Sequence, residues 1–474
     1  MPPLGDISIA QRRFDKRMPA HWLSEIMRRS HDGPFMREHD FDMTVAKTAR
    51  QLTKKYGIRF DPQTPVPWDD DLADRVYQAG LELFLEVGVY NMDTSRVIRF
   101  SRDEVEEILR HEPGQVVLGE GKDAVVMKAR KVEDKERPIV HSGPTGTPCS
   151  ETMHPRILIS CAQEPLIDCL GAGSVAMYHG QEIKPGTPLE IMGSRRDAIA
   201  ARMAVTAAGR PGMHINDVAV SLTCAGKMAA CNPQFGLRPS DGLLVSQMTE
   251  LKTNFDQLSR VAFLLDYGIR IVDLMTPLIG GVGGGAEGTA IVSIATHLLG
   301  ATCYCADYRM MSHTHLKWLN NTDRMGLWIM AEVGQALARN TRIVTLNDIY
   351  TVSGPGTEEL LYEAAAGAVT GTVSGMNIQG CGCTGGSLTD HYTGLEARFA
   401  AEVSRAVVGM SRQQANELVL KILPLYEHTF DAPRRGLPFQ EVYDPLTVQP
   451  KPAWTEPYAR AKEKLASLGI HFVT

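Results

Sequence analysis

The segment IRIVDLMTPLIGGVGGGAEGTAIVSIATHLLG, residues 269–300, contains the pattern on which the fold assignment depends. A short β-rich run at 269–275 is followed by a glycine-rich turn at 280–288 and by a helical stretch that begins near Ala286. A strand followed by a helix is the unit from which parallel sheets are built.

The same alternation extends outward from this segment in both directions. Further strands are predicted at 138–145, 213–220, 301–308, 342–350 and 368–375, and helices at 246–266 and 395–407. Because strands and helices alternate over roughly 300 residues, the sequence predicts an α/β fold, and this length suits a TIM (β/α)8 barrel with insertions. A doubly wound sheet is the alternative.

Two flanking segments differ from this central region in composition. Residues 1–125 are predicted to form an N-terminal helical extension, in which Leu72, Val76, Ala79 and Leu83 share one helix face. Residues 126–430 are assigned to the barrel. Residues 431–474 are rich in proline and are predicted to wrap over the surface, with a last helix at about 456–468.

Composition excludes several classes of protein. The chain has 474 residues, of which 43% are hydrophobic and 22% charged, so global disorder is excluded. A net charge of −6 argues against nucleic-acid binding. No run reaches the ~18 apolar residues of a membrane span, and the N-terminal residues lack the apolar core of a signal peptide. Nine scattered cysteines are typical of cytosolic thiols, and we predict a cytoplasmic protein.

The glycine-rich turn formally matches a nucleotide-binding motif. Gly283, Gly285 and Gly288 satisfy the pattern GxGxxG between a strand and a helix, and Asp307 follows 24 residues after Gly283. Pro277 lies between the strand and the glycines, and the motif occurs in the middle of the chain. We therefore favour a loop that allows close approach of a ligand or partner over a dinucleotide site.

The paired cysteines could indicate zinc, but their spacing is unfavourable. Cys303 and Cys305 form one pair and Cys381 and Cys383 the other, with His313, His315 and His391 as further candidates. Structural zinc sites usually separate their cysteines by two to four residues. Buried cysteines that act as small hydrophobic residues are the favoured interpretation, and we predict no bound metal.

Polar residues occur where several of the predicted strands end. Active sites of barrel enzymes are built at the C-terminal ends of the strands. Each such residue alone is typical of a turn or helix cap, so their value lies in their number. They are His214, Asn216, Asp217, Asp273, Asp348 and Tyr350.

Many short blocks, in order and at nearly constant spacing, then give the sequence a specific resemblance. Among them are GVY at 88–90, RPIV at 137–140, GPTG at 143–146, AGRPGM at 208–213, ELK at 250–252, ATH at 295–297, TGLEAR at 393–398 and FQE at 439–441. With these blocks the chain, from about Tyr56 onward, resembles the monomethylamine methyltransferase family. These pyrrolysine-containing enzymes pass a methyl group from methylamine to a cognate corrinoid protein. The resemblance implies a TIM barrel, a homo-oligomer (a hexamer in the family) and a separate corrinoid-protein partner.

The departures from the family concern the site. The position of pyrrolysine is occupied here by Asn216, and two family glutamates correspond to Leu244 and Leu274. A family glutamine and tyrosine correspond to Asp348 and Tyr350, so only the tyrosine remains. The resemblance also retains Glu287 and the glycines, which implies that Gly283, Gly284 and Gly285 face the corrinoid.

These changes argue against turnover of monomethylamine. A neutral amine is a poor leaving group, and asparagine offers no electrophilic carbon to hold it. We therefore expect a methyltransferase that uses another small methylated compound: a quaternary amine, a sulfonium, a methyl halide or an ether. A non-catalytic or repurposed barrel is the alternative. No tightly bound cofactor is expected, because the corrinoid (cobalamin) belongs to the partner. Expected catalytic residues are Asn216, Asp348 and Tyr350, and expected substrate-binding residues are His214, Leu244, Leu274, Asp273, Tyr304 and Glu287.

Overall fold

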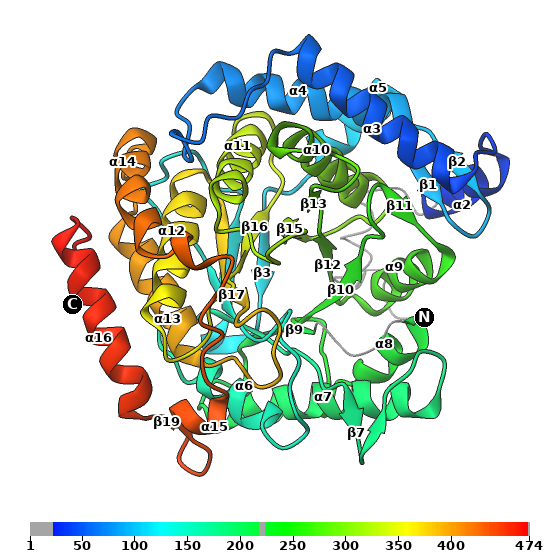
Figure 1. Ribbon diagram of the computed structural model, residues 1–474. Helices are drawn as coiled ribbons and strands as arrows, with labels where there is room; N and C mark the ends of the chain where they lie inside the picture. The colour runs from blue at the N-terminus through cyan, green and yellow to red at the C-terminus, as the bar shows by residue number, and fades with distance from the viewer. Residues whose placement is uncertain (1–21, 218–222, 473–474) are drawn as a thin grey trace.

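The computed structural model describes residues 22–217 and 223–472, and its centre is a closed barrel of eight parallel strands (Figure 1). The predicted TIM barrel is therefore confirmed, and the doubly wound sheet is wrong. In barrel order the strands are β10 (Gly242–Ser246), β12 (Arg270–Met275), β14 (Tyr308–Met311), β16 (Thr345–Tyr350), β17 (Asn377–Cys383), β5 (Val140–Ser142), β6 (Cys169–Gly171) and β9 (His214–Asp217).

A ring of helices surrounds the barrel (Figure 1). Capping boxes define the N-terminal ends of two of these helices, with Asn254 and Gln257 at α9 and Thr393 and Glu396 at α13. The helices are α6 (His154–Ala162), α7 (Pro188–Ala207), α8 (Cys224–Ala230), α9 (Phe255–Tyr267), α10 (Ala286–Thr302), α11 (Arg324–Asn340), α12 (Glu358–Val373) and α13 (Gly394–Ala406). Short strand pairs lie in the loops: β7 (Met177–Tyr178) with β8 (Gln181–Glu182), and β13 (Leu278–Ile279) with β15 (Thr314–His315).

The predicted strands at 138–145, 269–275 and 342–350 are confirmed, and 213–220 is confirmed over His214–Asp217, since 218–222 lie outside the described residues. The strand at 301–308 is wrong, because α10 continues to Thr302 and the strand begins only at Tyr308. The strand at 368–375 is also wrong. Residues 368–373 form the end of α12 instead, and the β-branched residues of this helix are tolerated because nearly the whole helix is buried. The helix at 246–266 begins only at Phe255, and β6, β10 and β17 were not predicted.

A small hydrophobic cluster, distinct from the main core, fills the part of the barrel near the N-terminal ends of its strands. It contains inward-facing residues of several strands together with residues of the hairpin β3 (Gln115–Leu118) and β4 (Val125–Lys128). This hairpin closes the N-terminal end of the barrel, where Figure 1 shows β3 behind the strands. The cluster comprises Val116, Leu118, Met127, Ile139, Cys169, Leu244, Val272, Tyr308, Met310, Val344 and Leu346. The open mouth is therefore at the C-terminal ends of the strands.

The N-terminal extension packs across one side of the barrel. It contains α2 (Trp22–Asp32), α3 (Glu38–Lys55), α4 (Asp70–Val87), β1 (Val89–Asn91), β2 (Arg96–Ile98) and α5 (Arg102–His111). The helix α4 lies against α10 and α11, and β1 pairs in parallel with β11 (Lys252–Thr253) of a barrel loop. The boundary placed after residue 125 divides the β3–β4 hairpin, so the extension is better ended before Gln115.

The C-terminal segment follows α14 (Arg412–Ile422) and wraps the surface as predicted. It contains α15 (Phe439–Val442), β18 (Tyr443–Asp444), β19 (Gln449–Pro450) and the last helix, α16, which covers Pro452–Ser467. Trp454 is buried, and its Nε1 donates to Thr393 Oγ1 at 2.9 Å, which attaches α16 to the barrel. No described helix is long and apolar enough to cross a membrane.

Candidate functional site

Asn216 is fully buried on the inner face of the barrel, near the C-terminal end of β9. Its Nδ2 donates to Met310 Sδ of β14 at 3.0 Å, a contact across the barrel interior between strands that are not neighbours. Its Oδ1 has no hydrogen-bond partner among the described residues. A buried carbonyl without a donor costs free energy, so this oxygen is a candidate contact for a ligand.

Asp348 points into the same space from β16. Its Oδ2 accepts from Ser312 Oγ at 2.9 Å and from Thr145 Oγ1 at 3.5 Å, while Oδ1 has no partner among the described residues. Burial raises the pKa of Asp348 to about 7, and no cation among the described residues compensates its charge. A Cβ on Gly382 would overlap the carboxyl group, so glycine at that position gives the carboxyl its room.

Tyr350 lies at the end of the same strand. Its ring and hydroxyl pack beside Gly146, and burial raises its pKa well above the usual value, so the phenol stays protonated. Asn321 orients this strand end, because its Oδ1 accepts from Tyr350 N at 2.9 Å and its Nδ2 donates to Asp348 O at 2.6 Å. The three expected catalytic residues thus all belong to the mouth of the barrel.

Leu244, Leu274 and Met310 form an apolar wall below and beside these polar groups. His214 belongs to a lower layer, in which its Nε2 lies 3.1 Å from Tyr308 Oη and its Nδ1 lies 2.8 Å from Ser240 O. His141 lies beside it, 6.0 Å between ring centroids. Burial lowers the pKa of both imidazoles to about 3. Both rings are therefore neutral at physiological pH, and neither carries an extra proton that it could transfer to a substrate.

Two expected substrate-binding residues lie outside the barrel wall, which corrects their assignment. Asp273 alternates with the inward-facing Val272 and Leu274, and it therefore points outward, where its Oδ2 accepts from Gln247 Nε2 at 2.7 Å. Tyr304 donates from its hydroxyl to Thr253 Oγ1 at 2.8 Å, on the outer side of the strands. Neither contacts the interior that holds Asn216. The side chain of Asp217 is outside the described residues.

Glu287 also lies outside the interior. Its Oε1 accepts from Phe60 N of the N-terminal extension at 3.1 Å. The neighbouring glycines form an exposed turn at the start of α10, in which a Cβ on Gly288 would overlap the carbonyl of Gly283. The spacing of the GxGxxG pattern therefore reflects packing of the turn onto the first turn of α10.

Ser312, Thr145 and Gln379 are site residues that the sequence analysis missed. Ser312 directly follows β14, and the rule of polar residues at strand ends would have found it if that strand had been placed at Tyr308–Met311. Gln379 belongs to β17, which was not predicted, because the nearest predicted strand was placed at 368–375. Thr145 lies beyond β5 within a predicted strand, and nothing in its local pattern distinguishes it.

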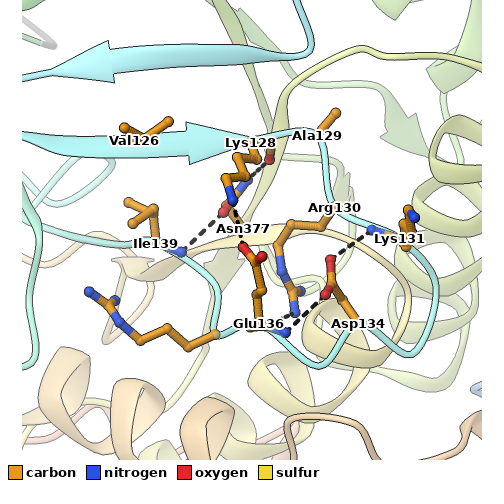
Figure 2. Close-up of a pocket in the computed structure, with 10 residues that line it drawn as sticks. Val126, Lys128, Ala129, Arg130, Lys131, Asp134, Glu136, Ile139 and Asn377 are labelled. Atoms are coloured by element: carbon orange, nitrogen blue, oxygen red, sulfur yellow. Dashed lines mark hydrogen bonds and ion pairs between the residues drawn. The ribbon is translucent and has the colours of Figure 1, made fainter.

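A cavity of about 210 Å³ lies at the opposite end of the barrel, between β4 and the start of β17 (Figure 2). Arg130 is buried there, and its Nη1 donates to the carbonyls of Thr372 and Met376 at the C-terminal end of α12. Lys128 pairs with Glu136 at 2.8 Å. These charges hold the 129–139 loop in place, and the cavity is remote from Asn216.

No group of three or more His, Cys, Asp or Glu side chains in the described ranges is arranged to hold a metal ion. The candidate thiols Cys303, Cys381 and Cys383 are buried, and burial raises the pKa of each. They are therefore thiols rather than thiolates at neutral pH.

Comparison with known proteins identifies the family. The model of the family "Monomethylamine methyltransferase MtmB" matches residues 23–470. Monomethylamine methyltransferase MtmB of Methanosarcina mazei is 34% identical over 437 residues, which cover 92% of this chain and 95% of that protein. The crystal structure of the Methanosarcina barkeri enzyme superposes with a TM-score of 0.92 at 33% identity, covering 95% of this chain and 98% of that one. A crystal structure of a hydroxylamine MtmB complex gives the same TM-score. From fold and sequence together, this chain belongs to the monomethylamine methyltransferase MtmB family.

Proposed function

We propose that this protein transfers a methyl group from a small methylated compound other than monomethylamine to the Co(I) of a separate corrinoid protein. The observation that carries the proposal is the buried Asn216 inside the barrel mouth, at the position that the resemblance assigns to pyrrolysine. The family framework surrounds it, but the group that would hold the amine covalently is replaced by an amide.

The chemistry of the interior supports a change of substrate. Asparagine can donate and accept hydrogen bonds but has no electrophilic carbon for an amine to add to. Leu244 and Leu274 occupy the positions of two family glutamates and cannot transfer protons. The donor must therefore bring a leaving group that needs no protonation.

The partner would approach the open C-terminal mouth, because the β3–β4 hairpin fills the other end. Gly284 and Gly285 are exposed at the rim, and glycines there let a bulky planar group come close. The corrinoid would be supplied by that partner, so the isolated protein should carry no tightly bound cofactor. Assembly into a homo-oligomer is proposed from the family resemblance.

A donor screen with Co(I) as acceptor tests the function. Purified protein, confirmed by mass spectrometry to carry asparagine at 216, is mixed anaerobically with cob(I)alamin and each candidate donor, and formation of methyl-Co(III) is followed by absorbance. At least one quaternary ammonium, sulfonium, halide or ether should give protein-dependent methylation, and monomethylamine should give little. Rapid methylation by monomethylamine would contradict the proposal, and failure of every donor would favour a non-catalytic barrel.

A further inference from the structure

The unsatisfied polar atoms inside the barrel are predominantly oxygen acceptors. Asn216 Oδ1, Asp348 Oδ1 and Gln379 Oε1 are buried without a donor among the described residues. The amide of Gln379 is oriented by its Nε2, which donates to Gly143 O at 3.3 Å and leaves the oxygen free. A methyl halide or an ether offers no donor and no positive charge, so it would leave all three oxygens uncompensated.

The interior also holds an uncompensated negative charge, that of the Asp348 carboxylate. No described Lys or Arg side chain forms an ion pair with Asp348, and Arg309 of the adjacent strand β14 pairs with Glu112 instead. In a site of low dielectric, an uncompensated carboxylate attracts a cation strongly even without a direct hydrogen bond. The missing partner of Asp348 is therefore a positive charge.

The other half of the interior, formed by Leu244, Leu274 and Met310, offers no free acceptor to an N–H group. Leu244 and Leu274 have no acceptor, and Met310 Sδ already accepts from Asn216 Nδ2. An N–H group that faces this wall would lose its hydration without gaining an acceptor. The methyl groups of a fully substituted cation would instead make favourable apolar contacts there.

We propose that the methyl donor is a small onium cation without N–H groups, most simply a quaternary ammonium, whose charge is held by Asp348 and whose methyl groups contact Leu244, Leu274 and Met310. This inference rests on the proposed function and narrows its substrate class. In the transfer, the Co(I) electron pair forms the new Co–C bond, and the electrons of the C–N bond leave with nitrogen. The product is a neutral tertiary amine, so no proton is required, in agreement with an interior whose histidines are neutral.

Binding measurements without any corrinoid test this inference separately from the methyl transfer. Tetramethylammonium and choline are titrated into the protein by calorimetry, with 3,3-dimethylbutan-1-ol as the neutral analogue of choline. Choline should bind at least about tenfold more tightly than its neutral analogue, because only choline compensates Asp348. Asp348→Asn should weaken choline binding at least about tenfold and abolish the preference.

Asp273→Asn is the matched control. Asp273 is also a buried aspartate on a barrel strand, and burial raises its pKa to about 7, but it points outward. This variant should bind choline as the unmodified protein does, and thermal unfolding confirms that both variants are folded.

A pH series adds a readout that packing alone would not change. Burial raises the pKa of Asp348 to about 7, and the titratable groups that face it, Tyr350, Cys381 and Cys383, all have raised pKa values and stay neutral. Choline has a fixed charge, so its affinity should rise between about pH 6 and about pH 8 as Asp348 ionises, and Asp348→Asn should remove this rise.

Equal affinity for choline and its neutral analogue, no effect of Asp348→Asn, an equal loss in Asp273→Asn, or no binding of either cation would each overturn the inference. Cation binding at Asp348 without any methylation of Co(I) would instead overturn the proposed function and leave the cation site in place.

Discussion

Glu332 on α11 is a fully buried carboxyl whose two oxygens have no hydrogen-bond partner in the described part of the chain. Burial, with a smaller contribution from Asp69, raises its pKa to about 8. Because the pKa in the folded state lies above that in the unfolded state, the stability contributed by the neutral form is complete below about pH 4.5 and is lost as the pH rises to about 8. Glu332→Gln should therefore raise the free energy of unfolding at pH 8 by on the order of 2–4 kcal/mol and change it little at pH 4.5.

Denaturant unfolding at both pH values measures this difference. Glu363→Gln is the contrasting variant, since burial also raises the pKa of Glu363 to about 7 but its oxygens accept from Thr322 Oγ1, Val352 N and Ser353 N. An amide there would oppose an N–H donor, so this variant should lose stability. A Glu332→Gln variant that is less stable at pH 8 would contradict the assignment of an uncompensated carboxyl.

In the turn before α10, neighbouring glycines differ in what limits their substitution: the backbone conformation at one and the space around the Cα at another. Gly284 has open space around its Cα but a φ of +80°, so a larger residue there would strain the backbone. Gly285 has an ordinary φ of −77°, and a Cβ would lie 3.4 Å from Glu287 Oε2. Gly285→Leu, rather than a change of Gly284, should keep the fold and reduce methyl transfer to the corrinoid partner about tenfold or more by blocking close approach.

Transfer rates to partner-bound corrinoid, compared with choline binding in the same variant, measure this effect. Gly288→Ala is the structural comparison, because its Cβ would overlap the carbonyl of Gly283 and should lower the melting temperature. An unchanged transfer rate in a folded Gly285→Leu protein would place the corrinoid elsewhere.

The N-terminal extension and the barrel share one hydrophobic core, which runs from Ile26 to Ile470. The two pack closely at Gly80 of α4, where a Cβ would overlap the side chain of Ile294 on α10. Gly80→Leu should lower the free energy of unfolding by about 1–3 kcal/mol or more, because the two helices would have to separate.

Gln78→Leu, on an exposed position of the same helix, is the control for helix propensity and should change stability little. Both variants are compared by denaturant unfolding. Equal stability of Gly80→Leu and the unmodified protein would show that α4 and α10 do not pack against each other at this position as closely as the overlap indicates.

The sequence by itself determined the barrel, the flanking segments and the family, because alternating strands and helices and ordered motif blocks are properties of local order along the chain. Through the family pattern it also predicted Asn216, Leu244, Leu274 and Asp348 as altered positions and Tyr350 as a retained one. It misassigned 368–375, because burial of α12 on nearly all sides outweighs the strand propensity of its β-branched residues.

Only the tertiary structure decided which face each residue takes. Period-two alternation tells that Asp273 and Leu274 point opposite ways, but both faces of a barrel strand are buried, so the sequence does not say which one is the interior. The structure therefore places three expected substrate-binding residues outside the barrel interior: Asp273, Tyr304 and Glu287. Ser312, Thr145 and Asp348 meet through hydrogen bonds between strand ends that are far apart in the chain. They are brought together by the pairing of β14 with β16, and of β16 and β5 with β17, which the local sequence does not specify.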